Sequence, residues 1–194
     1  MGAGVIPFAI HNNQLYFLFQ TVFVGRKTGF YIDFGGGVDD GESSQHAATR
    51  EFVEETETLF FAQGAEEISN ARRTPERISQ QISIMSQQFE KTLNANPNWW
   101  CKREPGNKVP AKDWITFFVE IDYQDLSPIN KEWGKYSQQP QRFKKRRQLH
   151  WLESGELLAI YQNHPEKLWK RVRQLVNVQE LIQEIKQEKV GDNK

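Results

Sequence analysis

The sequence has a single cysteine, no net charge and no long apolar run. Cys101 alone can form neither an internal disulfide nor a cysteine-based zinc site. The 25 basic residues balance the 25 acidic ones, which argues against a broadly basic nucleic-acid-binding coat and against an acidic disordered tail. No apolar segment approaches the roughly 18 residues that span a bilayer, and the N-terminus lacks the features of a signal peptide. We therefore expect a soluble cytoplasmic protein without membrane contact.

The chain of 194 residues is long enough for one domain with appendages and a hydrophobic core. Apolar segments at 5–10 and 15–19 flank the polar turn His11–Gln14, whose two asparagines tolerate positive φ, so this region predicts a β-hairpin. Further strands are expected at 30–34, 114–121 and 148–152. The glycines at 35–37 are expected to lie outside any regular element.

Two helices have recognisable starts. Ser43 is a predicted N-cap, and Ala48, Phe52 and Leu59 recur on one stripe after it. Thr74 followed by Pro75 predicts a second helix start. The apolar face of this second helix comprises Ile78, Ile82, Met85, Phe89 and Leu93. A short helix is expected at 153–161 and a longer one from Leu168 onward, with irregular connections at 94–112 and 124–141.

One acidic surface of the first helix calls for a chemical explanation. Glu51, Glu54 and Glu55 stand at positions i, i+3 and i+4 and share a helix face, where each like-charge pair costs about a few tenths of a kcal/mol. A divalent cation would turn this repulsion into attraction, because carboxylates are preferred ligands of Mg²⁺ and Mn²⁺. The alternative is an ordinary solvated acidic face. The preceding glycines, which let a backbone approach a metal or phosphate closely, favour the cation.

The same stretch resembles the Nudix box, whose pattern is G-x5-E-x7-R-E-U-x-E-E-x-G-U, where U is bulky and apolar. Seven of its nine fixed positions match, at Gly36, Glu42, Arg50, Glu51, Phe52, Glu54 and Glu55. Glu57 and Thr58 depart from the pattern. Glu57 stands where the family has a glycine that ends the helix, so we expect the helix to run on through Leu59 and Phe60.

The resemblance implies a fold and a domain organisation. The fold class is α/β, a Nudix-like α/β/α sandwich with a mixed central sheet, a helical insertion and C-terminal helices. The hydrolase domain would span residues 1–161, with the helical insertion and an irregular connection at 66–112. Residues 162–194 would form a C-terminal helical extension.

The resemblance also implies an activity: divalent-metal-dependent hydrolysis of the pyrophosphate linkage of a nucleoside diphosphate derivative. The metal, Mg²⁺ or Mn²⁺, would be held by Glu51, Glu54, Glu55 and the Gly36 carbonyl. The implied catalytic residues are Glu51, Glu54 and Arg50. Glu51 is the first choice for the group that takes a proton from water, and Arg50 would hold a glutamate in place. Glu42 would brace the loop against the helix.

Substrate recognition is the least determined part. Arg26, Lys27, Gly37, Lys144 and Arg146 are the candidate substrate-binding residues. The last two belong to the basic run at 142–147, which could hold substrate phosphates, contact a nucleic-acid backbone or remain a solvated loop. RNA is therefore a second candidate partner, and the 74–93 helix is a candidate homodimer contact. The alternative function is a non-catalytic nucleotide- or RNA-binding module that retains the Nudix fold.

Overall fold

A mixed β-sheet forms the centre of the protein. The computed structural model describes residues 1–71, 73–104, 113–134 and 147–191, and within them the sheet has six strands in the order β4-β5-β1-β2-β6, with β3 also paired to β1. Of these described strands, β1 and β5 pair in parallel and the other neighbours pair antiparallel. The strands are β1 (Gly2–His11), β2 (Gln14–Val22), β3 (Phe34–Gly37), β4 (Trp100–Lys102), β5 (Trp114–Glu120) and β6 (Arg147–Glu153).

The predicted β-hairpin is confirmed and forms the long arm of this sheet. Asn12 and Asn13 make its turn with φ values of 48° and 62°, the left-handed conformation that a tight hairpin requires. The second half of β1 pairs with β2, whereas its first half, Gly2–Val5, pairs with β3. Strands β2 and β3 therefore pair with different halves of β1, and β3 brings its glycines beside the first half.

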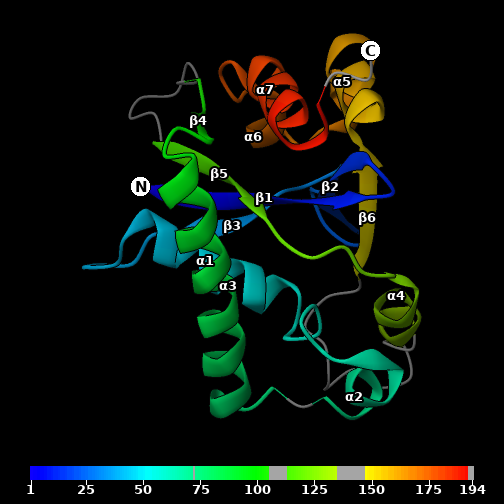
Figure 1. Ribbon diagram of the computed structural model, residues 1–194. Helices are drawn as coiled ribbons and strands as arrows, with labels where there is room; N and C mark the ends of the chain where they lie inside the picture. The colour runs from blue at the N-terminus through cyan, green and yellow to red at the C-terminus, as the bar shows by residue number, and fades with distance from the viewer. Residues whose placement is uncertain (72, 105–112, 135–146, 192–194) are drawn as a thin grey trace.

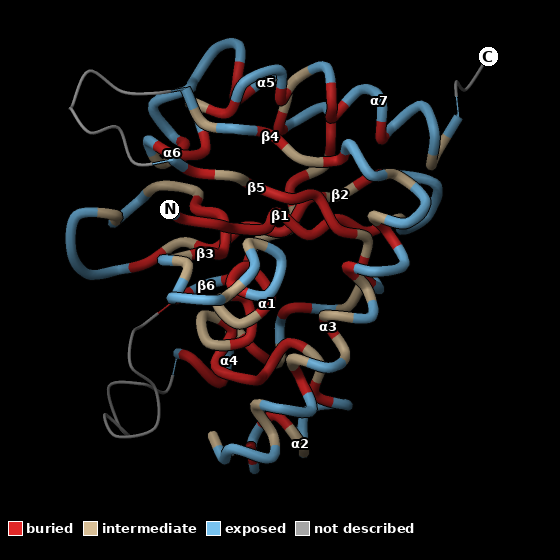
Figure 2. Tube along the Cα trace, turned by 90° about the vertical axis from the view of Figure 1, so that its left-hand side faces the viewer, coloured by how far each residue is buried: buried red, intermediate tan, exposed pale blue. Residues whose placement is uncertain are grey.

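Helices cover both faces of the sheet, which confirms the predicted α/β/α sandwich with a mixed sheet (Figure 1). On one face, α1 (Ser44–Glu55) and α3 (Pro75–Ala95) pack over Ala3, Val5 and Phe117. The other face is covered by α5 (Ser154–Asn163), α6 (Lys170–Arg173) and α7 (Val178–Val190). Buried backbone is concentrated in the strands between these layers, and the outer helix surfaces are exposed (Figure 2).

Both predicted helix starts are confirmed. The Ser43 side chain accepts a hydrogen bond from the backbone N–H of His46, and Thr74 accepts one from the N–H of Arg77. Each side chain satisfies an amide that the first turn leaves unpaired. None of the helices in the described ranges combines the length and the apolar character needed to cross a membrane.

Four segments differ from the sequence-based expectations. The connection at 94–112 contains β4, which pairs with β5 at the sheet edge. The expected loop at 124–141 contains α4 (Ser127–Gly134), where Asn130 bonds both backbone groups of Leu149 in β6. Helix α2 (Gly64–Asn70) was not expected. The C-terminal helix predicted from Leu168 is divided into α6 and α7 by Asn177, which has a φ of 56°. Tertiary contacts stabilise all of these short elements, and these contacts have no local sequence pattern.

The glycines at 35–37 lie inside a strand, so the prediction that they avoid regular structure is wrong. A Cβ atom on Gly35 would lie 2.4 Å from the carbonyl oxygen of Ala3 and 2.5 Å from the Cα of Gly4. The glycines thus permit an unusually close approach of β3 to β1. The strand expected at 30–34 begins only at Phe34, and Tyr31 and Ile32 form isolated bridges instead.

Helix α1 ends at Glu55, so its predicted continuation through Leu59 and Phe60 is also wrong. The N–H of Thr58 donates to the carbonyl of Val53, and the N–H of Glu57 donates to that of Glu54. These two bonds form a Schellman ending, in which the residue after the C-cap adopts a left-handed conformation. Glu57, with a φ of 54°, adopts the conformation for which the Nudix pattern has glycine.

Candidate active site

The backbone of β3 meets the acidic face of α1 at Gly36. A Cβ atom at this position would lie 2.0 Å from Oε1 of Glu51, so any other residue here would displace this carboxylate from the backbone. Burial raises the pKa of Glu51, and the negative charges of Glu55 and Glu54 add to this effect. Glu51 is therefore a carboxylate held against backbone in a poorly solvated position, where it binds a proton more readily than usual.

Arg50 connects this carboxylate to the loop that follows β3. Its Nε and Nη2 donate to the two oxygens of Glu42, each at 3.0 Å, while Nη1 donates to Glu51 at 3.1 Å. Nη2 also donates to the Gly37 carbonyl at 3.0 Å. The Arg50 guanidinium, with backbone Asp39 and His46, lowers the pKa of Glu42 to about 2. The loop end, the strand end and Glu51 are thus held by one side chain.

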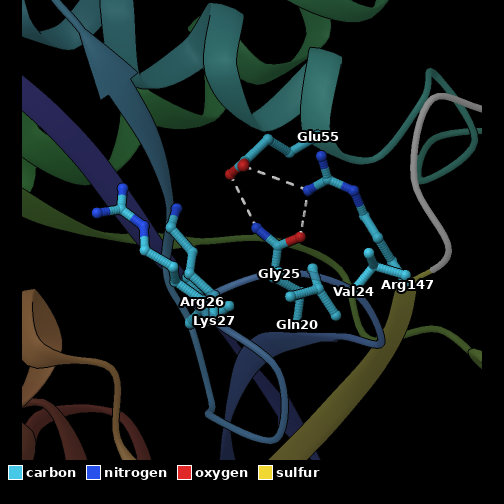
Figure 3. Close-up of a pocket in the computed structure, with 9 residues that line it drawn as sticks. Gln20, Val24, Gly25, Arg26, Lys27, Glu55 and Arg147 are labelled. Carbon is cyan, nitrogen blue, oxygen red and sulfur yellow. Dashed lines mark hydrogen bonds and ion pairs between the residues drawn. The ribbon is translucent and has the colours of Figure 1, made fainter.

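Glu55 lies one helical turn further along α1 and has a different set of partners. Its Oε2 accepts hydrogen bonds from the Gly35 N–H at 3.0 Å and from Nε2 of Gln20 at 2.8 Å. Its Oε1 lies 3.2 Å from Nη1 of Arg147, which also donates to Oε1 of Gln20. The three side chains form a closed triangle (Figure 3). Gln20 and Arg147 are buried, so Glu55 is held from the sheet side.

Glu54 is the most exposed of the three acidic residues. Its carboxylate lies 3.8 Å from Arg50 and 3.7 Å from Arg73, and 38% of its side chain is exposed. These long contacts at a partly exposed position allow the carboxylate to turn toward a ligand at little cost, because such ion pairs contribute under about 1 kcal/mol.

The acidic residues of α1 are the candidate ligands for a divalent cation. Among the described residues, no group of three or more His, Cys, Asp or Glu side chains lies close enough together to hold a metal ion. The predicted set of Glu51, Glu54 and Glu55 therefore stays a prediction. Glu51 and Glu55 both face β3 and raise the negative potential there. Carboxylate oxygens are the hard donors that Mg²⁺ and Mn²⁺ prefer, so the chemistry of these side chains fits such an ion.

A pocket of about 250 Å³ opens beside Glu55. Two predicted substrate-binding residues, Arg26 and Lys27, line it. Gly37 is not among the lining residues, and its carbonyl accepts a hydrogen bond from Arg50. Lys144 and Arg146 lie outside the described residues. The complete lining is Gln20, Val22, Val24, Gly25, Arg26, Lys27, Ile32, Glu55 and Arg147.

Sequence reasoning did not identify the roles of Gln20 and Arg147. Gln20 ends the apolar run at 15–19 in β2, and it is only 1% exposed. That break in an otherwise apolar pattern was the available signal. Arg147 was grouped with the basic run, although it begins β6 and is buried.

No known family model matches the chain. An uncharacterized protein, L534, of Acanthamoeba polyphaga mimivirus is 42% identical to it over 62 residues, which are 30% of this chain and 20% of the relative. The match thus spans a fifth of that protein's length.

Several solved structures are similar to this chain, among them a Nudix hydrolase and a protein with a Nudix domain. An Ap4A hydrolase from C. elegans, solved as a binary complex, is 13% identical, with 95% of each chain covered and a TM-score of 0.44. NrtR from Shewanella oneidensis is 11% identical, with 97% of this chain and 64% of NrtR covered and a TM-score of 0.47. A Nudix hydrolase from Alicyclobacillus acidocaldarius is 14% identical, with 84% and 82% covered and a TM-score of 0.43.

Proposed function

We propose that residues 1–161 form a divalent-metal-dependent hydrolase that cleaves the pyrophosphate linkage of a nucleoside diphosphate derivative. The observation that carries the proposal is the Glu51 carboxylate, seated against the Gly36 backbone and held there by Arg50. On a solvated acidic face this carboxylate would be free to turn in water, whereas here it lies against the strand and is paired with Arg50. The sequence resemblance to the Nudix box is consistent with the same activity.

The proposed roles follow from the contacts of each side chain. Mg²⁺ or Mn²⁺, held by Glu51, Glu54, Glu55 and the Gly36 carbonyl, would supply positive charge to the phosphate oxygens. Glu51 would accept the proton of the attacking water at Oε2, the oxygen that Arg50 does not bind. The water oxygen forms the new bond to phosphorus as the bond to the bridging oxygen breaks. Arg50 keeps Oε1 of Glu51 fixed during this step.

Without a bound cation, burial and the neighbouring carboxylates raise the pKa of Glu51. A bound Mg²⁺ or Mn²⁺ would oppose this shift and keep Glu51 ionised, the form in which it accepts a proton. Glu42, with its pKa lowered to about 2, stays ionised and keeps Arg50 in position instead.

The test is a panel of nucleoside diphosphate derivatives incubated with Mg²⁺ or Mn²⁺, with products identified by mass. We expect turnover that disappears with excess EDTA, and a loss of about 10²–10⁴-fold in Glu51→Gln, the range typical of a removed general base. Glu90→Gln, on the exposed side of α3, is the matched control and should keep wild-type turnover. Full activity in EDTA would contradict the proposal. Tight nucleotide binding without any turnover would favour the non-catalytic binding module.

A further inference from the structure

The pocket beside Glu55 carries an excess of positive charge. Arg26, Lys27 and Arg147 line it together with one carboxylate, that of Glu55, which leaves a net charge of +2 among the ionisable groups of the lining. The Glu55 carboxylate already forms an ion pair with Arg147 and accepts hydrogen bonds from Gln20 and the Gly35 N–H. Among the lining residues the cations therefore outnumber the carboxylate, which favours an anion over a cation as the occupant.

Arg147 has one donor that the described residues do not satisfy. Its side chain is only 6% exposed, and its Nη1 serves both Gln20 and Glu55. Its Nε is buried and has no hydrogen-bond partner among the described residues. A buried donor without an acceptor costs about 1–3 kcal/mol, more when it is charged. A phosphate oxygen is an acceptor that matches the guanidinium.

The size of the pocket restricts what it can hold. Its volume of about 250 Å³ is below the roughly 300–1,000 Å³ of pockets for drug-sized ligands. The lining residues from β2, Gln20 and Val22, and from the following loop, Val24 to Lys27, include no aromatic side chain on which a base could stack. The pocket therefore suits a compact anion better than a nucleoside.

The position of the pocket relative to Glu51 identifies which anion it suits. Glu55 follows Glu51 by four residues, which places it about 6 Å further along the helix axis. We propose that this pocket binds a phosphate group of the substrate other than the one attacked beside Glu51, with Arg147, Arg26 and Lys27 as its ligands. This inference rests on the proposed function and adds a substrate class: compounds with a further phosphate beyond the cleaved linkage, such as nucleoside triphosphates, are preferred over nucleotide sugars.

A binding experiment without metal tests the site independently of catalysis. Inorganic tripolyphosphate is titrated calorimetrically in EDTA into the wild-type chain, Arg147→Gln and the double variant Arg26→Gln/Lys27→Gln. We expect the Kd to rise at least tenfold in both variants. The control, Lys131→Gln/Lys186→Gln, has the same change in charge at exposed helix positions and should stay within twofold.

Because Arg26 is exposed and Lys27 half-buried on a loop, the double variant should fold even if Arg147→Gln does not. Wild-type affinity in the folded double variant would overturn the proposal. Inorganic phosphate that binds as tightly as tripolyphosphate would indicate a free-phosphate site and would overturn the assignment to a substrate group.

Kinetics then test the substrate class. In the double variant, we expect KM to rise at least tenfold for a nucleoside triphosphate and to stay unchanged for a nucleotide sugar. An equal rise for both would mean general electrostatic attraction and would contradict a separate phosphate subsite. If the wild-type chain hydrolyses neither compound, the proposed function fails, whereas the calorimetric result still decides whether the pocket binds phosphate.

Discussion

The two ends of the glycine-containing segment 33–37 are each held by an arginine, but the two arginines come from opposite helical layers. Arg50 of α1 donates to the Gly37 carbonyl, and Arg171 of α6 donates to the Asp33 carbonyl, both at 3.0 Å. Each arginine also binds a carboxylate. Arg50 and its partner Glu42 are eight residues apart, whereas Arg171 and Asp33 are separated by 138.

The two pairs also differ in exposure. The Arg50 side chain is 20% exposed and that of Glu42 8%, while Asp33 is completely buried beside an Arg171 side chain that is 10% exposed. Solvent weakens the first pair and leaves it adjustable. The second pair is desolvated on both sides, so removal of one partner leaves an uncompensated buried charge. We infer that the Arg171 end anchors the C-terminal helices to the sheet, and that the Arg50 end positions the reactive carboxylate.

The largest expected effect on stability comes from Arg171→Met. Loss of one partner of a buried ion pair costs about 3–5 kcal/mol of unfolding free energy. Burial raises the pKa of Asp33 even with Arg171 present, and the variant would raise it further. A carboxyl group whose folded pKa is raised stabilises the fold less as pH rises through that pKa. Urea unfolding should therefore show a larger deficit at pH 8 than at pH 5.

The double variant Arg171→Met/Asp33→Asn is the control for this comparison. It removes the charge that the single variant leaves buried, so it should recover part of the lost stability at pH 8 and show little pH dependence. A deficit in the single variant that is below about 1 kcal/mol and independent of pH would show that burial does not distinguish the two pairs.

A smaller effect is expected from Glu42→Gln. Loss of the charged hydrogen bonds to Arg50 should cost about 2 kcal/mol at pH 6. The pKa of Glu42 is lowered from its ordinary value of 4.5 to about 2, so its contribution is fully present above 4.5 and is lost as pH falls toward 2. The difference between wild type and variant, measured by urea unfolding, should thus shrink between pH 6 and pH 3. A difference that stays constant over this range would argue against the ionised pair.

The smallest effect is expected at Glu57. This residue tests whether burial or separation along the chain distinguishes the two ion pairs. It is buried like Asp33, but its partner Arg73 is only 16 residues away, at 3.7 Å. Both Glu57→Gly and Glu57→Ala remove this contact, and only glycine relieves the left-handed φ of 54°. We expect the glycine variant to be more stable than the alanine variant by about 1 kcal/mol of unfolding free energy, and therefore to have the higher melting temperature. Equal melting temperatures would mean that a non-glycine residue adopts this left-handed conformation without a cost in unfolding free energy.

Local sequence patterns predicted much of the fold and most of the α1 side of the site. The asparagine turn, the Ser43 and Thr74 caps and the spacing of Arg50 from Glu42 all depend on neighbours within about one or two helical turns. The physical reason is that hairpin turns, caps and i, i+4 pairs involve only short-range geometry, which residue type and spacing determine. For the same reason the carboxylate face of α1 could be recognised before its environment was known.

Only the tertiary structure decided how that face is used. Gln20, Glu55 and Arg147 come from β2, α1 and β6, and the sheet order brings them into one triangle. Likewise, the extended conformation of the glycines depends on the close approach of β1, and the ending of α1 depends on hydrogen bonds that outweigh the preference of Glu57. Such contacts join residues up to 138 positions apart, as for Asp33 and Arg171, and their energies arise from packing and desolvation that no local pattern contains.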